Sequence, residues 1–438
     1  MPAAAWSHRP VFFGNPDSPE LRSRLLPASV PFRFFGTAAV FHCLAWLALY
    51  AASDAVSQQS GGLGPGIAAL HLFTLGVLVM TAIGASLQLL PIATRQPVAS
   101  ITAAKAVWWL LAPGVALLAA GMGIGPLPLA YAGAAAVIAA LAVYAWLLGN
   151  NLAHARGMPL VVAHGWAALA CLAGLAVSGY TLVAHHGMGF LPDLRGAAIL
   201  HLTLAAYGFM GMLVLGLSDL LIPMLAISPA PAKDGGYAVL GGCAAAIVLT
   251  VVFALAGAPR IAYAFSALVG AAASLVHVVR LARCLRRRHG RAQRRWLLLV
   301  FASWAMLPAS LLAAAALALD APVPRLPALF AALLVPGWLL TLLLGVLQRI
   351  APFLASVHAS GRARSAPLPS ALTADGPLNA HAACHFAALG LLAAGIAADR
   401  GELIAVGAVA GAAGAVAFAA FLAVLFLRLR RLAPASAG

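Results

Sequence analysis

Two histidines in apolar stretches are the residues of this sequence best suited to chemistry. His71 opens the stretch HLFTLGVLVMTAIGASLQLLPIA and His201 opens HLTLAAYGFMGMLVLGLSDLLIPML. An imidazole is costly to bury in a membrane, and its lone pair ligates metal ions and haem iron. The alternative is a structural hydrogen bond to a neighbouring helix. We expect His71 and His201 to be ligands.

A second group of histidines could form another metal site, but their spacing supports this less strongly. His381 and His385 are four residues apart, so on a helix they share one face and could hold one metal ion. His358 is expected near them, beyond the end of the preceding helix. Histidines at a membrane interface are common, so this second metal site is the less favoured interpretation. The remaining intramembrane histidines are single, and we expect structural roles for His42, His164 and His277, with His164 as the reserve ligand.

One carboxylate lies well inside an apolar stretch. Asp219 follows His201 by 18 residues, or five helical turns, so both lie on one helix face at opposite ends. Gln348 occupies the repeat-equivalent place, four residues before its proline, and Gln88 lies one residue later in its own stretch. These three polar residues could line a proton or ion path on the cytoplasmic side, or they could make hydrogen bonds between helices; we favour the second interpretation slightly.

These residues need a membrane to position them. Of the 438 residues, 63% are hydrophobic and only 8% are charged, which is too few charges for the surface of a soluble protein of this size. Continuously apolar stretches that are long enough to cross a membrane as a helix recur along the chain. Barrel strands would instead alternate apolar and polar residues, so the pattern favours α-helices. We predict twelve spans, at residues 33–52, 66–92, 101–121, 126–148, 159–184, 195–226, 236–256, 260–283, 296–318, 326–354, 379–397 and 402–427.

The basic residues predict an orientation. Four of the 26 Lys and Arg residues fall in the loops on one side, and the other 22 fall on the side of both chain ends. Because basic loops stay in the cytoplasm, we expect both termini to be cytoplasmic in the bacterial inner membrane. The net charge of +16 is then explained by topology and anionic lipid rather than by nucleic acid.

A threefold repeat divides the chain. The pattern G-x7-G-x6-P occurs at Gly76, Gly208 and Gly337, with offsets of 132 and 129 residues. Roughly a quarter of one match is expected by chance in this composition. We therefore predict one transmembrane domain, 33–431, of three four-helix units at about 33–148, 159–283 and 296–427, with cytoplasmic tails at 1–32 and 432–438.

The repeat strengthens the first histidine pair. His71 and His201 precede the glycines of units 1 and 2 by five and seven residues, so both are expected in the outer part of parallel, equivalent helices. In unit 3 the corresponding residues are Phe330, Ala331, Ala332 and Leu333, so a third imidazole is absent.

Several functional classes lack their signatures. The sequence has no G-x-x-x-x-G-K-[ST], no H-E-x-x-H, no G-x-S-x-G and no C-x-x-C-H. A nucleotide-driven pump, a zinc peptidase, a serine hydrolase and a cytochrome c domain are therefore not indicated.

The quoted stretches, with GVLQRIAPFLASVHAS (345–360), resemble the catalytic subunit of haem-copper oxidases and nitric-oxide reductases, and more closely their non-oxidase relatives such as the NnrS family. The resemblance implies b-type haem, copper, and a role in nitric oxide response. It matches His71 to a low-spin haem ligand and His201 to a copper ligand. The histidines that an oxidase carries on helix 7 and within helix 10 are absent, so a complete oxidase is not expected. The sequence also lacks the W-H-x-H-E segment of the NnrS family.

Three functions follow as hypotheses. The first is a multi-pass haem-binding or copper-binding protein acting in nitric oxide response or metal homeostasis. The second is a transporter without a cofactor, with a path through Asp219 and Gln348. The third is an accessory partner of a respiratory complex. Because the sequence shows no soluble domain and no C-x-x-C-H, electrons, if handled, are expected to arrive from another protein.

Overall fold

The computed structural model describes residues 23–56, 62–123, 125–231, 233–288, 294–359 and 367–431. Within these residues the regular secondary structure is helical, with no strands. Twelve of the helices are long and apolar enough to cross a membrane. The predicted all-α membrane bundle and the number of spans are confirmed. The predicted tails, 1–32 and 432–438, lie largely or wholly outside the described residues.

The helices form three units of four spans each. Unit 1 contains α2 (Ser29–Ala51), the composite span α4 (Pro65–His71), η1 (Leu72–Val79) and α5 (Met80–Thr94), then α6 (Ile101–Gly123) and α7 (Leu127–Ala153). Unit 2 contains α8 (Pro159–Met188), the composite α9 (Leu194–Leu202), η2 (Thr203–Gly211) and α10 (Met212–Ala226), then α11 (Lys233–Leu255) and α12 (Arg260–Arg286).

Unit 3 repeats this order. It contains α13 (Arg294–Ala318), the composite α14 (Leu326–Ala332), η3 (Leu333–Leu340) and α15 (Thr341–Ala359), then α17 (Asp375–Ala397) and α18 (Gly401–Arg431). Two short helices, α3 (Ser53–Val56) and α16 (Pro369–Leu372), lie between spans. His358, expected beyond its helix, lies in the last turn of α15.

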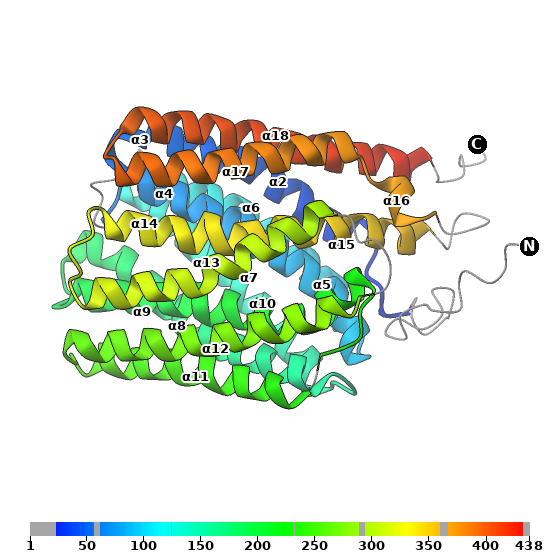
Figure 1. Cartoon of the computed structure of the whole chain (residues 1–438), viewed down its shortest axis with the longest axis horizontal. Helices are drawn as coiled ribbons and strands as arrows, with labels where there is room; N and C mark the ends of the chain where they lie inside the picture. The colour runs from blue at the N-terminus through cyan, green and yellow to red at the C-terminus, as the bar shows by residue number, and fades with distance from the viewer. Residues whose placement is uncertain are drawn as a thin grey trace, which may run out of the picture.

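The packing scheme is the same in each unit. The first span packs against the second, the third packs against the fourth, and the fourth packs against the first span of the next unit. The series closes on itself, because α18 packs against α2, and Figure 1 shows these first and last spans side by side. The pseudo-threefold arrangement predicted from the repeat is therefore the arrangement of the bundle.

The repeated glycines are explained by close contact with the first span of their own unit. A Cβ atom added at Gly84 or Gly216 would lie 2.6 or 2.5 Å from the Cβ atom of Phe34 or His164, and the equivalent contact of Gly345 is with Leu299 at 3.0 Å. The other glycine of each pair faces a residue seven positions further along the first span: Phe41, Cys171 and Met306. Small residues permit this approach of helices in lipid.

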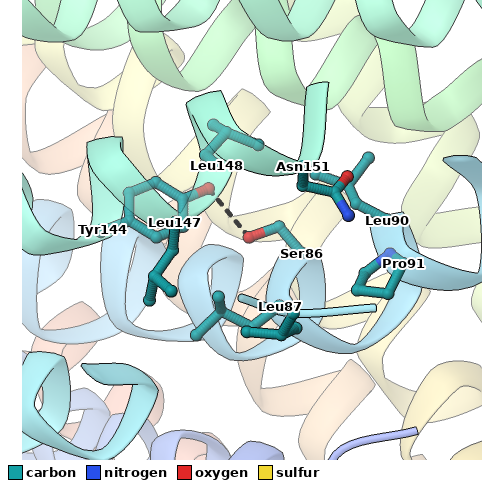
Figure 2. A pocket seen from close by; sticks show the side chains of 9 residues that line it. Ser86, Leu87, Leu90, Pro91, Tyr144, Leu147, Leu148 and Asn151 are labelled. Atoms are coloured by element: carbon teal, nitrogen blue, oxygen red, sulfur yellow. Dashed lines mark hydrogen bonds between the residues drawn. The ribbon is translucent and has the colours of Figure 1, made fainter. Parts of the chain in front are cut away.

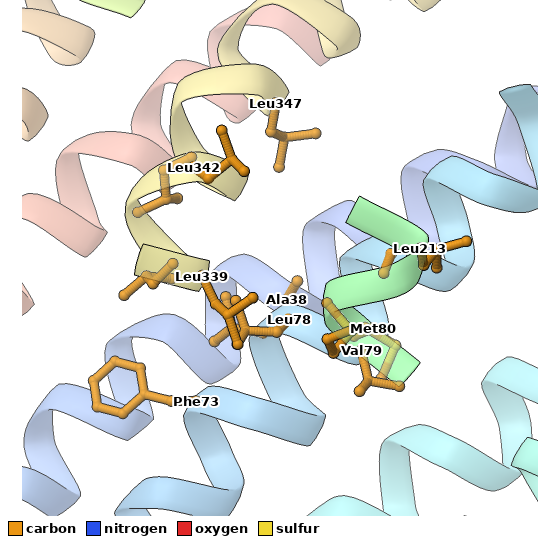
Figure 3. Close-up of a cluster of buried hydrophobic side chains, with 14 of the residues drawn as sticks. Ala38, Phe73, Leu78, Val79, Met80, Leu213, Leu339, Leu342 and Leu347 are labelled. Atoms are coloured by element: carbon orange, nitrogen blue, oxygen red, sulfur yellow. The ribbon is translucent and has the colours of Figure 1, made fainter. Parts of the chain in front are cut away.

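Each second span contains a π-helical segment at the same point of its unit. The segments begin at Leu72, Thr203 and Leu333, 131 and 130 residues apart. Helices with π turns are uncommon and often mark functional sites. Between these three spans lies a cluster of buried aliphatic side chains, including Leu78, Met80, Leu213 and Leu339 (Figure 3). The centre of the bundle is therefore filled with side chains.

The two ends of the bundle differ in charge. The basic end, where N and C are marked in Figure 1, carries most of the arginines, as the positive loops of the sequence predict. At the opposite end Arg260 pairs with Asp320, and Arg325 pairs with Asp399. The hydrogen bond and the charge of Asp399 hold the pKa of Arg325 above its usual value. These two arginines at the opposite end are therefore neutralised locally.

Candidate histidine sites

The first candidate site lies where α-helix changes to π-helix. His71 is the last residue of α4, directly before η1, and His201 lies in α9, two residues before η2. Both belong to the second span of their unit and to the end of the bundle opposite the basic end (Figure 1). The two imidazoles are close enough to interact electrostatically. The sequence prediction that they lie at similar depth agrees with this placement.

Hydrogen bonds indicate which ring nitrogen of each imidazole carries the proton. Nδ1 of His71 lies 2.9 Å from the carbonyl oxygen of Ile67, which can only accept, so Nδ1 is the donor. The Ser178 hydroxyl donates to the Leu175 carbonyl, and Nδ1 of His201 lies 3.3 Å from the same hydroxyl oxygen. Nδ1 of His201 is therefore also the donor. In both residues the lone pair is on Nε2.

This donor set fits one known type of cofactor ligation. A histidine that ligates a metal usually donates its other ring N–H to a carbonyl or another acceptor, which fixes the tautomer. His71 and His201, each with its lone pair on Nε2, are the side chains that would hold a haem iron if haem were bound here. Both side chains are half-buried rather than sealed in the core. Unit 3 has Ala331 and Ala332 at the corresponding place, as the sequence predicts.

A three-ligand metal centre is not formed by the described residues. Among them, no three His, Cys, Asp or Glu side chains converge in a way that could hold a metal ion. A copper centre with three imidazole ligands therefore does not fit these residues. The cavity beside Ser86 and Tyr144, whose hydroxyl oxygens lie 2.9 Å apart, has room for about one water molecule and none for a cofactor (Figure 2).

The second group of histidines is buried more deeply than the sequence suggests. His381 and His385, both on α17, are only 1% exposed, and their ring centres lie 5.6 Å apart. His42 on α2 joins them, with its ring centre 6.3 Å from that of His381. His358, expected in this group, has its ring against Phe32 at 6.2 Å.

Sequence reasoning missed His42 because it lies in the first span and its neighbours lie in the eleventh. The contact follows from ring closure, since α17 packs on α18 and α18 packs on α2. The signal that could have found it is the repeat itself, because a cyclic arrangement places the last spans of unit 3 beside the first span of unit 1.

Two of the three candidate ion-path residues, Asp219 and Gln348, make polar contacts between helices. Asp219 forms an ion pair with Arg280 of α12, and its carboxylate lies 3.9 Å from Nδ1 of His277. Gln348 accepts a hydrogen bond from Nε of Arg295 at 3.0 Å. These contacts are hydrogen bonds between helices, and the role of these residues in an ion path stays a prediction.

Gln88 differs from its two counterparts. Its side chain is fully buried, and neither its amide oxygen nor its amide nitrogen has a hydrogen-bond partner among the described residues.

Comparison with known proteins shows a likeness in fold but none in sequence. No model of a known protein family matches the chain, and no curated protein sequence matches it. A solved structure does: a heme-copper terminal oxidase dimer determined by cryo-EM, with a TM-score of 0.61 and 13% sequence identity, covering 94% of this chain and 85% of that chain. The fold is that of a haem-copper oxidase. At this identity the likeness concerns the backbone, and the resemblance to the NnrS family stays a prediction.

Proposed function

We propose that this membrane protein binds b-type haem on a haem-copper oxidase scaffold, with His71 and His201 as the residues that would hold the iron. The observation that carries the proposal is the pair of Nε2 lone pairs on equivalent spans at one end of the bundle. Each is fixed by a hydrogen bond on the other ring nitrogen, to Ile67 for His71 and to Ser178 for His201.

Bound haem would supply reversible one-electron chemistry or a binding place for a small gas such as nitric oxide. The residues of this chain would hold and orient the iron. The 2.9 Å hydrogen bond to the Ile67 carbonyl would fix the ring of His71, and the longer 3.3 Å contact to Ser178 would hold the ring of His201 less firmly.

The test is the reduced-minus-oxidised visible spectrum of detergent-purified protein from haem-replete cells. We expect a six-coordinate, low-spin spectrum in the wild type and loss of haem, or a high-spin spectrum, in His71→Ala and His201→Ala. The matched control is His164→Ala, because His164 is buried on α8 and makes the same 2.9 Å hydrogen bond to the carbonyl four residues before it. A folded but colourless wild type would contradict the proposal.

The buried ionic group on α10 and α12 supports a second candidate, a proton or ion transporter without a cofactor. Asp219 and Arg280 have side chains 7% and 10% exposed, and such pairs within a membrane often mark ion pathways. Transport assays in vesicles, with Asp219→Asn as the variant, test this candidate. Uptake that persists in this variant would argue against it.

The setting of the protein in a cell is also part of the proposal. The lipid bilayer is its environment, since twelve helices span it. We infer that the basic end faces the cytoplasm, because positively charged loops are retained there, and that the membrane is the bacterial inner membrane. Under this orientation the proposed haem lies on the outer side, where a respiratory or electron-transfer partner would supply electrons.

A further inference from the structure

The histidine trio of His42, His381 and His385 has no role in the proposed haem site. Each of its rings is 1% exposed and carries one buried nitrogen with no hydrogen-bond partner among the described residues: Nδ1 of His42, Nε2 of His381 and Nδ1 of His385. An unpartnered polar atom in an apolar interior is costly, so an occupant is expected. We propose that His381 and His385 together bind one soft monovalent cation, copper(I).

The hydrogen bonds of the trio show which of these nitrogens has a lone pair. Nδ1 of His381 lies 3.0 Å from the carbonyl oxygen of Gly414, so it donates and Nε2 has the lone pair. The Thr341 hydroxyl donates to the Pro336 carbonyl and lies 2.7 Å from Nε2 of His385. Nε2 of His385 is therefore the donor, and the lone pair is on its unpartnered Nδ1.

His42 has the opposite polarity. The indole N–H of Trp46, which can only donate, points to Nε2 of His42 at 3.0 Å. The unpartnered Nδ1 of His42 therefore carries a hydrogen and is not a ligand in this arrangement. The trio presents two lone pairs and one N–H group.

The ring separation permits one ion to contact both ligands. A metal–imidazole bond is about 2.0–2.1 Å long and the ring centre lies about 1.1 Å beyond the nitrogen, so two ligating rings have centres no more than about 6.4 Å apart. The 5.6 Å between the ring centres of His381 and His385 is within this limit.

The charge of the ion and the number of ligands that it needs favour a monovalent ion over a divalent one at this site. Phe418 packs on His381 with ring centres 5.0 Å apart, and Arg295 is the charged side chain that acts on His381. Among the described residues, no carboxylate joins the histidines in a three-ligand site. A divalent ion with two neutral ligands would keep its full double charge in a low dielectric, whereas a monovalent ion has a much smaller desolvation cost. Copper(I) is soft, is bound by imidazole, and tolerates two ligands.

The experiment measures binding of silver(I), a redox-inert analogue, and of copper(I) to the full-length protein in detergent. Haem-free protein is used, so the result is independent of the His71–His201 proposal. Cys43 and Cys384 adjoin the trio in sequence and are replaced by alanine, because thiolates bind soft ions more tightly than imidazole does. Bound metal is counted by mass spectrometry after gel filtration, and X-ray absorption identifies the ligand atoms.

We expect one ion per chain with two nitrogen ligands, and at least a tenfold loss of affinity in His381→Ala and in His385→Gln. The glutamine retains an N–H for Thr341, so this variant keeps the helix contact if the alanine variant fails to fold. His42→Phe should still bind one ion.

Three results would overturn the proposal: no bound ion in a folded protein, a stoichiometry unchanged by both ligand variants, or a metal bound by sulfur alone. A folded protein without metal would assign the trio to a trapped water, which could donate to both lone pairs and accept from His42.

Discussion

Units 1 and 2 share one backbone plan and differ in the buried polar residue near the proline of the second span: Asp219 lies four residues before Pro223, and Gln88 lies three residues before Pro91. In both units, a glycine of the second span, Gly84 or Gly216, packs directly against a side chain of the first span. Near the basic end, however, unit 2 has Asp219 in an ion pair with Arg280, whereas unit 1 has Gln88 with no partner among the described residues. The glycine contacts between the first and second spans are therefore the same in the two units, whereas the buried polar residues near the basic end differ.

Unit 3 is intermediate between these two. Its counterpart, Gln348, is 2% exposed and accepts one hydrogen bond from Arg295, which also pairs with Asp375. The three positions therefore form a series from a buried charge pair, through a charge-assisted hydrogen bond, to an amide with no partner. The series predicts three different costs of substitution.

The largest effect is expected from Arg280→Leu. Removing the guanidinium leaves the Asp219 carboxylate buried without its counter-charge, which costs about 3–5 kcal/mol of stability. Thermal unfolding in detergent measures the loss, and Arg283→Leu is the control because Arg283 is exposed on the same helix. The double variant with Asp219→Leu should recover most of the stability. If the double variant is no better than the single one, the pair is not the reason.

A smaller effect is expected from Gln348→Leu. Arg295 loses one acceptor but keeps Asp375 at 2.8 Å, so its charge stays paired. The expected loss is about 1.5–3 kcal/mol, typical of one hydrogen bond to a charged group. The same unfolding measurement applies, with Arg295→Leu as the companion variant, which should cost more. A loss as large as that of Arg280→Leu would remove the distinction between units 2 and 3.

The smallest effect is expected from Gln88→Leu. Replacing an unpartnered buried amide by an apolar side chain of similar length removes an unsatisfied group, so stability should be unchanged or rise by up to about 1 kcal/mol. Gln88→Glu is the useful contrast, because it places a charge where no partner is described. A marked loss in Gln88→Leu would mean that the amide has a bound partner, as an ion path requires.

Much of the fold follows from the sequence. Continuous apolar stretches locate the twelve spans to within a few residues, since a helix in lipid must satisfy its own backbone hydrogen bonds. The glycine–proline repeat gives the threefold plan and places His71 and His201 on equivalent helices. This information is local or periodic, and the sequence displays it directly.

The remaining features depend on contacts between distant residues. Nothing near Asp219 in sequence indicates Arg280, and nothing near His381 indicates His42. The π-helical segments were also not predicted, because they depend on how three spans meet, with Tyr207 of η2 stacked on Trp338 of η3 at 5.7 Å. The tautomer of a buried histidine likewise cannot be assigned from the sequence, because it depends on which hydrogen-bond acceptor lies beside the ring in the folded protein.

The closure of the bundle through α2 and α18 has a consequence for biogenesis. α2 is among the first spans to leave the ribosome, and α18 is the last described span to do so, yet they are neighbours in the finished protein. The surface of α2 that α18 covers must therefore be solvated by lipid or by an insertion factor throughout synthesis. Units 1 and 2 can assemble during translation, but the contact that completes the circle forms only after α18 itself has been synthesised and inserted.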